Sequence, residues 1–375
     1  MNHDTLVGDR AAQHSPFLLP SAGGRFRSKR TRGPGEVNLK SAGLLHPRAA
    51  ALHRRTLSEL DPLEVLTYPV FRSTYAMLAE HLGTTPSSLV LTAGSDPGLG
   101  LLTRAFPAAA RIVMHTPNYD SWVKFAQIAD CAIDAVPPDS GTGRFVLDDL
   151  VTRLRQGPPG FVVVTQPHSF TGQLHETLEL TALADAVGAH GSLLVVDTAY
   201  LAFAEGGEDR VREVMGQPHV VRVNSFSKSY GLSGARIAVL VAHPSTVRHL
   251  FDIDPESPVS GVALALLRSA LRQHGTFEEI WAEVRSLRTE FARGVEEAVP
   301  GWRARRSSGN FVTWDVPHPL QAAEATAFLY DHGYVIRDLS GQPGLPAAVR
   351  IAVTDGPTVR RVTDLLGTWW HLGRT

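Results

Sequence analysis

A single lysine in the segment NSFSKSYGLSGAR, residues 224–236, is the residue best suited to covalent chemistry. The sequence holds four lysines among 36 basic residues, so arginine is preferred almost everywhere else. Lysine can lose its proton and attack a carbonyl, whereas arginine stays charged. With Ser225, Ser227 and Arg236 around it, Lys228 would suit a phosphorylated aldehyde, taking the aldehyde while the others take the phosphate. A solvated surface loop is the alternative, which the long apolar segments on each side disfavour.

Two other segments carry polar residues at the ends of apolar runs. In LLVVDTAY, Asp197 is a costly residue to bury unless it is paired. It could keep a ring nitrogen protonated, or it could cap the next helix. In TAGSDPGLGLLTRAF, residues 92–106, Ser95 or Asp96 could cap a helix whose first N–H groups bind a phosphate. An ordinary capped helix explains the same residues.

The elements that position these residues are continuous apolar runs rich in valine, isoleucine and leucine. Such runs are typical of strands buried on both faces of a mostly parallel sheet. Ligands of such sheets bind at the carboxyl ends of the strands. The runs lie at 88–94, 111–117, 161–167, 193–199 and 220–226, with a further strand at 235–243. They therefore direct one set of residues toward one site: Gly94, Tyr119, Ser169, Asp197 and Lys228.

The pattern along the chain predicts three parts. Residues 1–55 form an N-terminal arm, partly irregular, which contains the basic stretch RFRSKRTRG at 25–33. We interpret that stretch as a solvated segment. Residues 56–255 form a large α/β domain. Residues 256–375 are richer in helical patterns and form a smaller C-terminal α+β domain.

Composition narrows the classes of function. The net charge of −1 gives no electrostatic case for a nucleic-acid or acidic-membrane partner. The single cysteine, Cys131, excludes an internal disulfide framework and a cysteine-built zinc site, and it fits a cytoplasmic location. No apolar stretch is long enough to cross a bilayer. Motifs of serine hydrolases, zinc proteases and P-loop enzymes are missing, and no metal site is expected.

Together these segments resemble a pyridoxal-phosphate enzyme of the aspartate-aminotransferase fold, over residues 60–370. The motif Ser-x-Ser-Lys followed by Gly-Leu-x-Gly-x-Arg is specific to such enzymes. Residues 333–353, GYVIRDLSGQPGLPAAVRIAV, resemble the C-terminal signature of the histidinol-phosphate aminotransferase branch. The implied fold is a fold-type I pyridoxal-phosphate-dependent transferase, with a mostly parallel central sheet, helices on both faces and a smaller C-terminal α+β domain.

The resemblance implies a role for each residue that would hold the cofactor. Lys228 forms the Schiff base and shuttles the proton, Asp197 pairs with the pyridine nitrogen, and Tyr200 bonds the phenolic oxygen of the ring. Tyr119 stacks on the ring face. The phosphate is held by Gly94, Ser95, Asp96, Ser225, Ser227 and Arg236.

It also implies how a partner subunit and the substrate bind. Tyr68 would reach the phosphate of the neighbouring subunit, which requires a homodimer. Arg350 would grip the substrate carboxylate through its two-pronged guanidinium, and Arg337 would face the distal end of the substrate. For Tyr68 and Tyr119, a place in the core or in an interface is the alternative.

The segment TQPHSFTGQL, residues 165–174, departs from the pattern Asn-Pro-x-Asn-Pro-Thr-Gly that relatives usually carry. Ser169 replaces the asparagine that bonds the ring oxygen, and Phe170 replaces a proline. His168 could compensate for the shorter serine, or it could be an ordinary core histidine. The entry VNLKSAGLLHP at 37–47 departs as well. These departures weaken the case for histidinol phosphate itself as the substrate.

The expected activity is transamination between an amino acid, or an amino phosphate, and a keto acid. Small-molecule donors and acceptors are the expected partners. A second possibility keeps the cofactor and changes the reaction to decarboxylation, elimination, oxidation or cyclisation. A third is a non-catalytic binding protein of the same fold, which the presence of the lysine, aspartate and both arginines disfavours.

Overall fold

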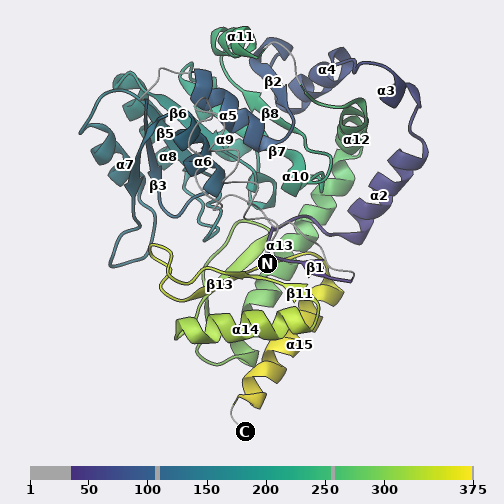
Figure 1. The fold of residues 1–375 in the computed structure, drawn as a ribbon, viewed down its shortest axis with the longest axis vertical. Coiled ribbons are helices and arrows are strands. Elements are labelled where there is room, and N and C mark those ends of the chain that lie inside the picture. Colours follow the sequence, from purple (N-terminus) through teal and green to yellow (C-terminus); the bar gives the residue numbers. More distant parts are fainter. Residues whose placement is uncertain (1–34, 106–109, 255–257, 374–375) are drawn as a thin grey trace, which may run out of the picture. The chain divides into compact units, whose positions relative to one another are not determined.

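The computed structural model describes residues 35–105, 110–254 and 258–373, so the basic stretch at 25–33 lies outside the described residues. Glu36–Thr375 form a compact unit built around a seven-stranded sheet (Figure 1). The strand order is β2-β8-β7-β6-β5-β3-β4, and only β8 runs antiparallel to its neighbours. The strands are β2 (Leu89–Thr92), β3 (Arg111–His115), β4 (Ala132–Val136), β5 (Phe161–Thr165), β6 (Leu193–Asp197), β7 (Val220–Ser225) and β8 (Ala238–Val241).

Both faces of this sheet are covered, which explains the continuous apolar runs. Along β5, Phe161 and Val163 lie in one core cluster, whereas Val162 and Val164 lie in another. The first cluster contains residues of α5 (Ser95–Ala105), α6 (Asp120–Ile128) and α11 (Pro244–Ile253). The second contains residues of α7 (Leu147–Leu154), α8 (Thr177–Ala189) and α9 (Asp209–Arg212). The predicted α/β architecture is confirmed.

One strand, β4, was not predicted from the sequence. It lies at the edge of the sheet and pairs only with β3 among the described strands. Four of its five residues are exposed or half-buried, and only Val136 is buried. An edge strand of this kind lacks the continuous apolar signature from which the other strands were inferred.

The C-terminal part carries a four-stranded antiparallel sheet in the order β12-β13-β10-β9. The strands are β9 (Arg303–Ala304), β10 (Phe311–Asp315), β12 (Arg337–Asp338) and β13 (Ala348–Ala352). The helices are α12 (Gly261–Arg272), α13 (His274–Ala298), α14 (Pro319–Asp331) and α15 (Gly356–Leu372). Figure 1 shows α14 next to β13. This is the α+β composition predicted from residue 256 onward, and the domain boundary itself stays a prediction.

Between residue 35 and the large sheet, the structure describes a short strand and several helices. Strand β1 (Val37–Asn38) pairs in parallel with β11 (Tyr334–Val335), and Ala352 N donates to Leu39 O at 3.0 Å. Helices α2 (Pro47–Ser58), α3 (Leu63–Leu66) and α4 (Arg72–His81) follow. The short elements are η1 (Pro86–Ser88), η2 (Leu201–Phe203), η3 (Val214–Gly216) and α10 (Phe226–Ser229). The pairing of β1 holds the backbone from residue 37 onward against the C-terminal strands.

Candidate active site

The predicted residues follow strands that end at the same edge of the large sheet. Strands β2, β3, β5, β6 and β7 run in one direction, because β2 and β7 are both antiparallel to β8. Their carboxyl ends therefore meet at one edge, where such sheets bind ligands. The residues that come just after these ends are Gly94, Ser95, Asp96, Tyr119, Ser169, Tyr200, Ser227 and Lys228, and Asp197 and Ser225 are the last residues of their strands.

Lys228 lies in the short helix α10, directly after β7. The helix begins at a serine cap, in which the Ser225 hydroxyl accepts from Ser227 N at 3.3 Å. The Ser233 hydroxyl donates to Ser227 O at 2.7 Å and holds the end of the turn. The Lys228 ammonium donates to Ser41 O, which is 187 residues away in the sequence. The amine is thus held by local capping on one side and by the N-terminal segment on the other.

Asp197 is buried at the end of β6, with 5% of its surface exposed. Burial raises the pKa of its carboxyl to about 6, because the charged form loses its hydration. The carboxylate of Asp96 raises this pKa further, whereas Ala199 N, donating at 3.0 Å, and the charge of Lys228 lower it. The lysine is therefore close enough to act on the aspartate, as the predicted roles require.

Arg236 covers the turn between β2 and α5. Gly94 has a φ of +97°, and a Cβ there would lie 2.6 Å from Arg236 Nη2, so only glycine allows this approach. Asp96 Oδ2 lies 4.0 Å from the same nitrogen, and Asp96 Oδ1 accepts from the Tyr119 hydroxyl at 2.8 Å. A carboxylate repels a phosphate, so Asp96 would serve a phosphate through its backbone and would orient Arg236 and Tyr119 with its side chain.

Arg350 is buried in the middle of β13, and 2% of its surface is exposed. Its Nη2 donates to Lys40 O at 2.8 Å, and its Nη1 donates to Ser169 O. Burial lowers the pKa of the guanidinium to about 10, and the nearby Tyr200 opposes this shift. Burial also raises the pKa of Tyr200. The structure thus brings Tyr200 and Arg350 together, and two backbone carbonyls accept hydrogen bonds from the arginine.

Arg337 lies directly opposite Arg350, as its partner in the β12–β13 pairing. It is more open, with 25% of its side chain exposed. Its Nη2 lies 3.8 Å from Asp120 Oδ2, and its guanidinium carbon lies 4.7 Å from the centre of the Phe170 ring. The two arginines therefore lie side by side on neighbouring strands of the C-terminal sheet.

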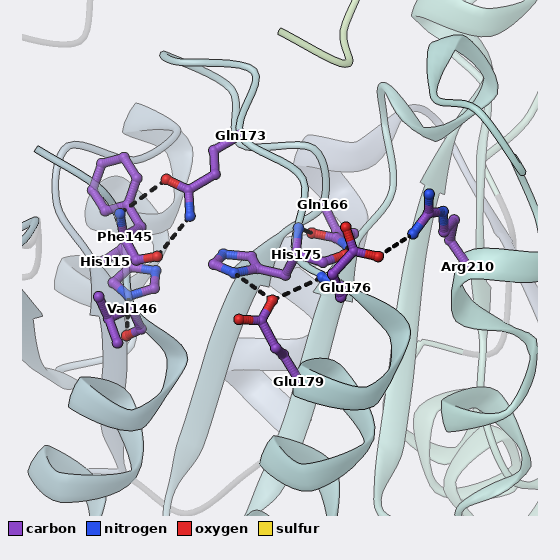
Figure 2. A network of polar contacts seen from close by, with 9 residues as sticks. All are labelled: His115, Phe145, Val146, Gln166, Gln173, His175, Glu176, Glu179 and Arg210. Carbon is purple, nitrogen blue, oxygen red and sulfur yellow. Dashed lines mark hydrogen bonds and ion pairs between the residues drawn. The ribbon is translucent and has the colours of Figure 1, made fainter. Parts of the chain in front are cut away.

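The loop that carries Ser169 is held by side chains on both sides. Gln166 Nε2 donates to His175 O at 2.7 Å while its oxygen accepts from His175 N at 3.0 Å (Figure 2). Gln173 makes the same kind of two-bond clamp to the backbone of Phe145, at 2.9 and 2.6 Å. The Ser169 hydroxyl is buried and has no hydrogen-bond partner in the described part of the chain. A rigid loop thus presents one unpaired hydroxyl.

His168 does not take over the role of the missing asparagine. Its Nε2 donates to Pro117 O at 3.0 Å, and its Nδ1 accepts from the Thr171 hydroxyl at 3.2 Å. Both ring nitrogens are therefore used, one within the loop and one by the distant Pro117 carbonyl. Burial lowers the pKa of His168 well below its usual value, so the ring is neutral. Of the two interpretations from the sequence, the structure supports a core histidine.

Tyr68 lies between α3 and α4, and 96% of its surface is exposed. Nothing within the described part of this chain covers it, which excludes a place in the core. Its predicted contact with a neighbouring subunit stays a prediction.

Sequence reasoning missed three participants. Lys40 and Ser41 act through carbonyl oxygens, which every residue has, so no residue type marks them. Asn118 accepts from the Thr165 hydroxyl at 2.9 Å and has a buried amide nitrogen without a partner. Its position next to Tyr119 in TPNYDSW was the available signal.

The donor set fits pyridoxal phosphate. The structure places an amine, a buried carboxylate of raised pKa and an arginine over a glycine turn around the ends of adjacent strands. The buried, unpaired Ser169 hydroxyl and Asn118 amide are the kind of polar groups that a bound ligand would satisfy. Within the described ranges, no three histidine, cysteine, aspartate or glutamate side chains are arranged to hold a metal ion. None of the described helices is both long and apolar enough to cross a membrane.

Comparison with known proteins also points to a pyridoxal-phosphate enzyme. Relatives include the histidinol-phosphate aminotransferases of Roseobacter denitrificans, 30% identical over 76% of this chain and 77% of that protein, and of Thermococcus kodakarensis, 26% identical over 80% and 83%. A crystal structure of histidinol-phosphate aminotransferase from Sinorhizobium meliloti in complex with pyridoxal-5'-phosphate has a TM-score of 0.80 at 21% identity, covering 96% of this chain and 100% of that one. L-threonine-O-3-phosphate decarboxylase from Porphyromonas gingivalis shares the fold, with a TM-score of 0.75 at 19% identity over 89% and 99%.

These comparisons confirm the fold-type I architecture, the similarity to histidinol-phosphate aminotransferases, the cofactor and the aminotransferase activity predicted from the sequence. The family model described as aminotransferase class I and II matches residues 48–366, which is most of the chain. The chain belongs to the aminotransferase class I and II family, whose members are pyridoxal-phosphate-dependent enzymes.

Proposed function

We propose that the protein transfers an amino group between an amino acid, or an amino phosphate, and a keto acid, with Lys228 as the catalytic amine. The observation that carries this proposal is the placement of Asp197 and Lys228 at the carboxyl ends of the neighbouring parallel strands β6 and β7. The charge of the lysine acts on a carboxyl whose pKa burial has raised to about 6. At neutral pH this carboxyl is mostly ionised, so it can accept a hydrogen bond from a protonated ring nitrogen.

The remaining site residues would hold pyridoxal phosphate. Arg236 and the turn at Gly94 supply positive charge and backbone N–H groups for the phosphate, with Ser95, Asp96, Ser225 and Ser227 around them. Tyr119 would cover the ring, and Tyr200 and Ser169 would face its phenolic oxygen. When bound, the cofactor would supply the electron sink that stabilises a carbanion at the substrate.

Lys228 would move the proton. Its amine holds a hydrogen bond to Ser41 O, so it needs to leave that carbonyl before it accepts the α-proton of a substrate. Arg350 would bind the substrate carboxylate, and one of its nitrogens donates to the neighbouring Lys40 O. Displacement of the 40–41 backbone would therefore release the catalytic amine and one nitrogen of the substrate arginine together.

We also propose a homodimer in which Tyr68 of one subunit reaches the phosphate of the other. The supporting observation is the exposure of its side chain at 96%, which is unusual for a tyrosine without a partner. We propose a cytoplasmic location, which fits the single cysteine. The large domain, 56–255, would hold the cofactor, and the small domain, 256–375, would supply Arg337 and Arg350.

The test is a titration of the purified, cofactor-loaded protein with a panel of amino acids, followed by absorbance and mass spectrometry. Conversion of the cofactor to its pyridoxamine form, with a matching keto acid, would support transamination and identify the donor. Release of CO₂ or ammonia, or uptake of oxygen, would instead show that the same site performs decarboxylation, elimination or oxidation. Absence of any visible band after addition of cofactor would contradict the role of Lys228.

A further inference from the structure

Phe170 occupies the position next to the unpaired Ser169 and has a structural setting of its own. It is 2% exposed and forms a small core cluster with Leu339, Leu345 and Ala348, separate from the cores of the two sheets. Those three residues come from the strand β13 and the connection between β12 and β13. The aromatic ring is therefore fixed to the part of the chain that carries both candidate substrate arginines.

The ring of Phe170 supports Arg337. The guanidinium carbon lies 4.7 Å above the ring centre, within the range of a cation–π interaction. A phenyl ring has no carbonyl or carboxylate oxygen, so this contact takes up none of the guanidinium N–H groups in a conventional hydrogen bond. The phenyl ring thus holds the arginine in place without consuming the donors that an anionic ligand needs.

The one anion near Arg337 in the described part of the chain is a weak competitor. Asp120 Oδ2 lies 3.8 Å from Arg337 Nη2, and the aspartate side chain is 76% exposed. Exposed ion pairs of this length contribute little, because water screens both charges. An anionic group of a substrate can therefore replace Asp120 at small cost.

The backbone of Phe170 is also bonded to the strand next to the one that carries Arg350. Thr313 donates from its hydroxyl to Phe170 O at 2.6 Å, and Thr313 lies opposite Arg350 in the β10–β13 pairing. Arg350 also lies over an aromatic ring, with its guanidinium carbon 4.9 Å from the centre of the Phe311 ring. The two guanidiniums are thus neighbours across one sheet, and each lies against its own phenyl ring.

We infer that Phe170 is a positioning residue for Arg337, and through it determines a preference for substrates that carry a second anionic group beside the carboxylate. This inference rests on the proposed function only in taking Arg350 as the carboxylate site. The second group would be a carboxylate or a phosphate, because both match the planar donors of a guanidinium.

The experiment measures binding of unreactive acids to the cofactor-loaded protein by the change in cofactor absorbance. Pentanoate carries one anionic group, whereas glutarate and 4-phosphonobutanoate each carry two. We expect the wild type to bind at least one of the dianions about 10-fold more tightly than pentanoate. The tighter of the two identifies the second group as carboxylate or phosphate. Equal affinity for all three acids would overturn the inference.

Variants separate the role of the ring from general damage. Phe170→Leu should weaken the preferred dianion about 5-fold and leave pentanoate within about 2-fold, whereas Phe170→Tyr, which keeps the ring face, should restore the preference. In an Arg337→Gln background, Phe170→Leu should have no further effect on the dianion, because the arginine that it positions is gone. Equal losses for mono- and dianions, or an undiminished effect in that background, would contradict the inference.

The two proposals can fail separately. Acid binding does not depend on turnover, so the dianion preference can hold even where no amino acid is transaminated. Conversely, transamination of amino acids with one carboxylate, together with equal binding of all three acids, would overturn the role of Phe170 and leave the proposed function intact. Asp120→Asn gives an additional test, since removal of the competing anion should tighten dianion binding about 2-fold, and weaker binding would contradict it.

Discussion

Two groups of buried ionisable residues, Asp197 at the active site and the pair His115 and His175, are treated by the protein in opposite ways. At the active site, Asp197 is buried with a pKa raised to about 6, and it lies near the cation of Lys228. In the second group, His115 and His175 are buried with their rings stacked, 6.2 Å between centres (Figure 2). Burial lowers the pKa of His115 to about 4 and that of His175 to about 3.

The two groups differ in whether burial leaves the side chain uncharged at neutral pH. The histidines are neutral, and His115 Nε2 donates to Val146 O at 3.0 Å. At the active site the acid is mostly ionised at neutral pH, and the Ser169 hydroxyl and Asn118 amide nitrogen have no hydrogen-bond partner among the described residues. A cluster of titratable residues is thus no sign of chemistry by itself. The sign is a buried group kept close to ionisation next to unpaired polar atoms.

The largest effect should come from removal of the catalytic amine. Lys228→Ala should lower turnover by at least about 10³-fold, because no other described amine faces Asp197, while the stability of the fold changes little. Lys124→Ala, on α6, is the matched control and should keep its activity. Steady-state rates and thermal unfolding of both variants make the measurement. Substantial turnover by Lys228→Ala would show that Lys228 is not the catalytic amine and that the site near Asp197 is not set apart by its chemistry from the histidine pair.

Acidification should lower the free energy of unfolding through His115 and His175. Both histidines have a pKa in the folded protein below the usual 6.5, so their contribution to stability is complete above pH 6.5 and is lost as the pH falls toward about 4 and 3. At pH 5 the loss amounts to about 2 kcal/mol for each. Urea unfolding between pH 7 and 5 measures it.

A variant assigns that acid sensitivity to the cluster. His175→Asn should flatten the decrease in the free energy of unfolding between pH 6.5 and 5. Exposed His371→Asn is the control for loss of a histidine. An unchanged slope in His175→Asn would place the acid-sensitive group elsewhere.

Asp197→Asn should separate stability from function at the active site. The carboxyl has a folded pKa of about 6 against a usual 3.8, so its favourable contribution is complete below pH 3.8 and is lost as the pH rises through 6. The neutral amide avoids this loss and can still accept from Ala199 N. Above pH 7 the cofactor-free variant should therefore be more stable by up to about 3 kcal/mol.

Unfolding of both cofactor-free proteins in urea at pH 8 gives the comparison, and cofactor binding should be weaker in Asp197→Asn because the ring nitrogen loses its anionic partner. A variant less stable than the wild type at pH 8 would show that the aspartate is satisfied in the fold, as the histidines are.

The smallest effect should come from Glu179, which lies beside the histidines. Its Oε2 accepts from Glu176 N at 2.8 Å and lies 4.0 Å from His175 Nδ1 (Figure 2). Glu179→Gln keeps an acceptor for the helix cap and removes only the charge. Since His175 is neutral, the free energy of unfolding at pH 7 should change by less than about 0.5 kcal/mol. A loss above about 1 kcal/mol would mean that His175 carries a proton.

Local patterns were enough to predict the central strands and the residues at their ends. The runs that became β2, β3, β5, β6 and β7 are buried on both faces, and this requires continuous apolar residues. Strand β4 was missed because it is an edge strand with exposed positions. The role suggested for His168 could not be decided, because Pro117 O, which occupies its Nε2, comes from a segment 51 residues away.

The sequence by itself determined the chemistry: a rare lysine between two strands, a carboxylate at a strand end and an arginine over a glycine turn. Each of these depends on a side chain that no other residue type replaces, and each sits next to a local structural signal. Only the tertiary structure decided what surrounds them. The carbonyls of Lys40 and Ser41 on Arg350 and Lys228, and the seat of Arg337 on Phe170, join distant segments. Backbone acceptors carry no residue signature, and strand register across long connections follows from packing of the whole fold.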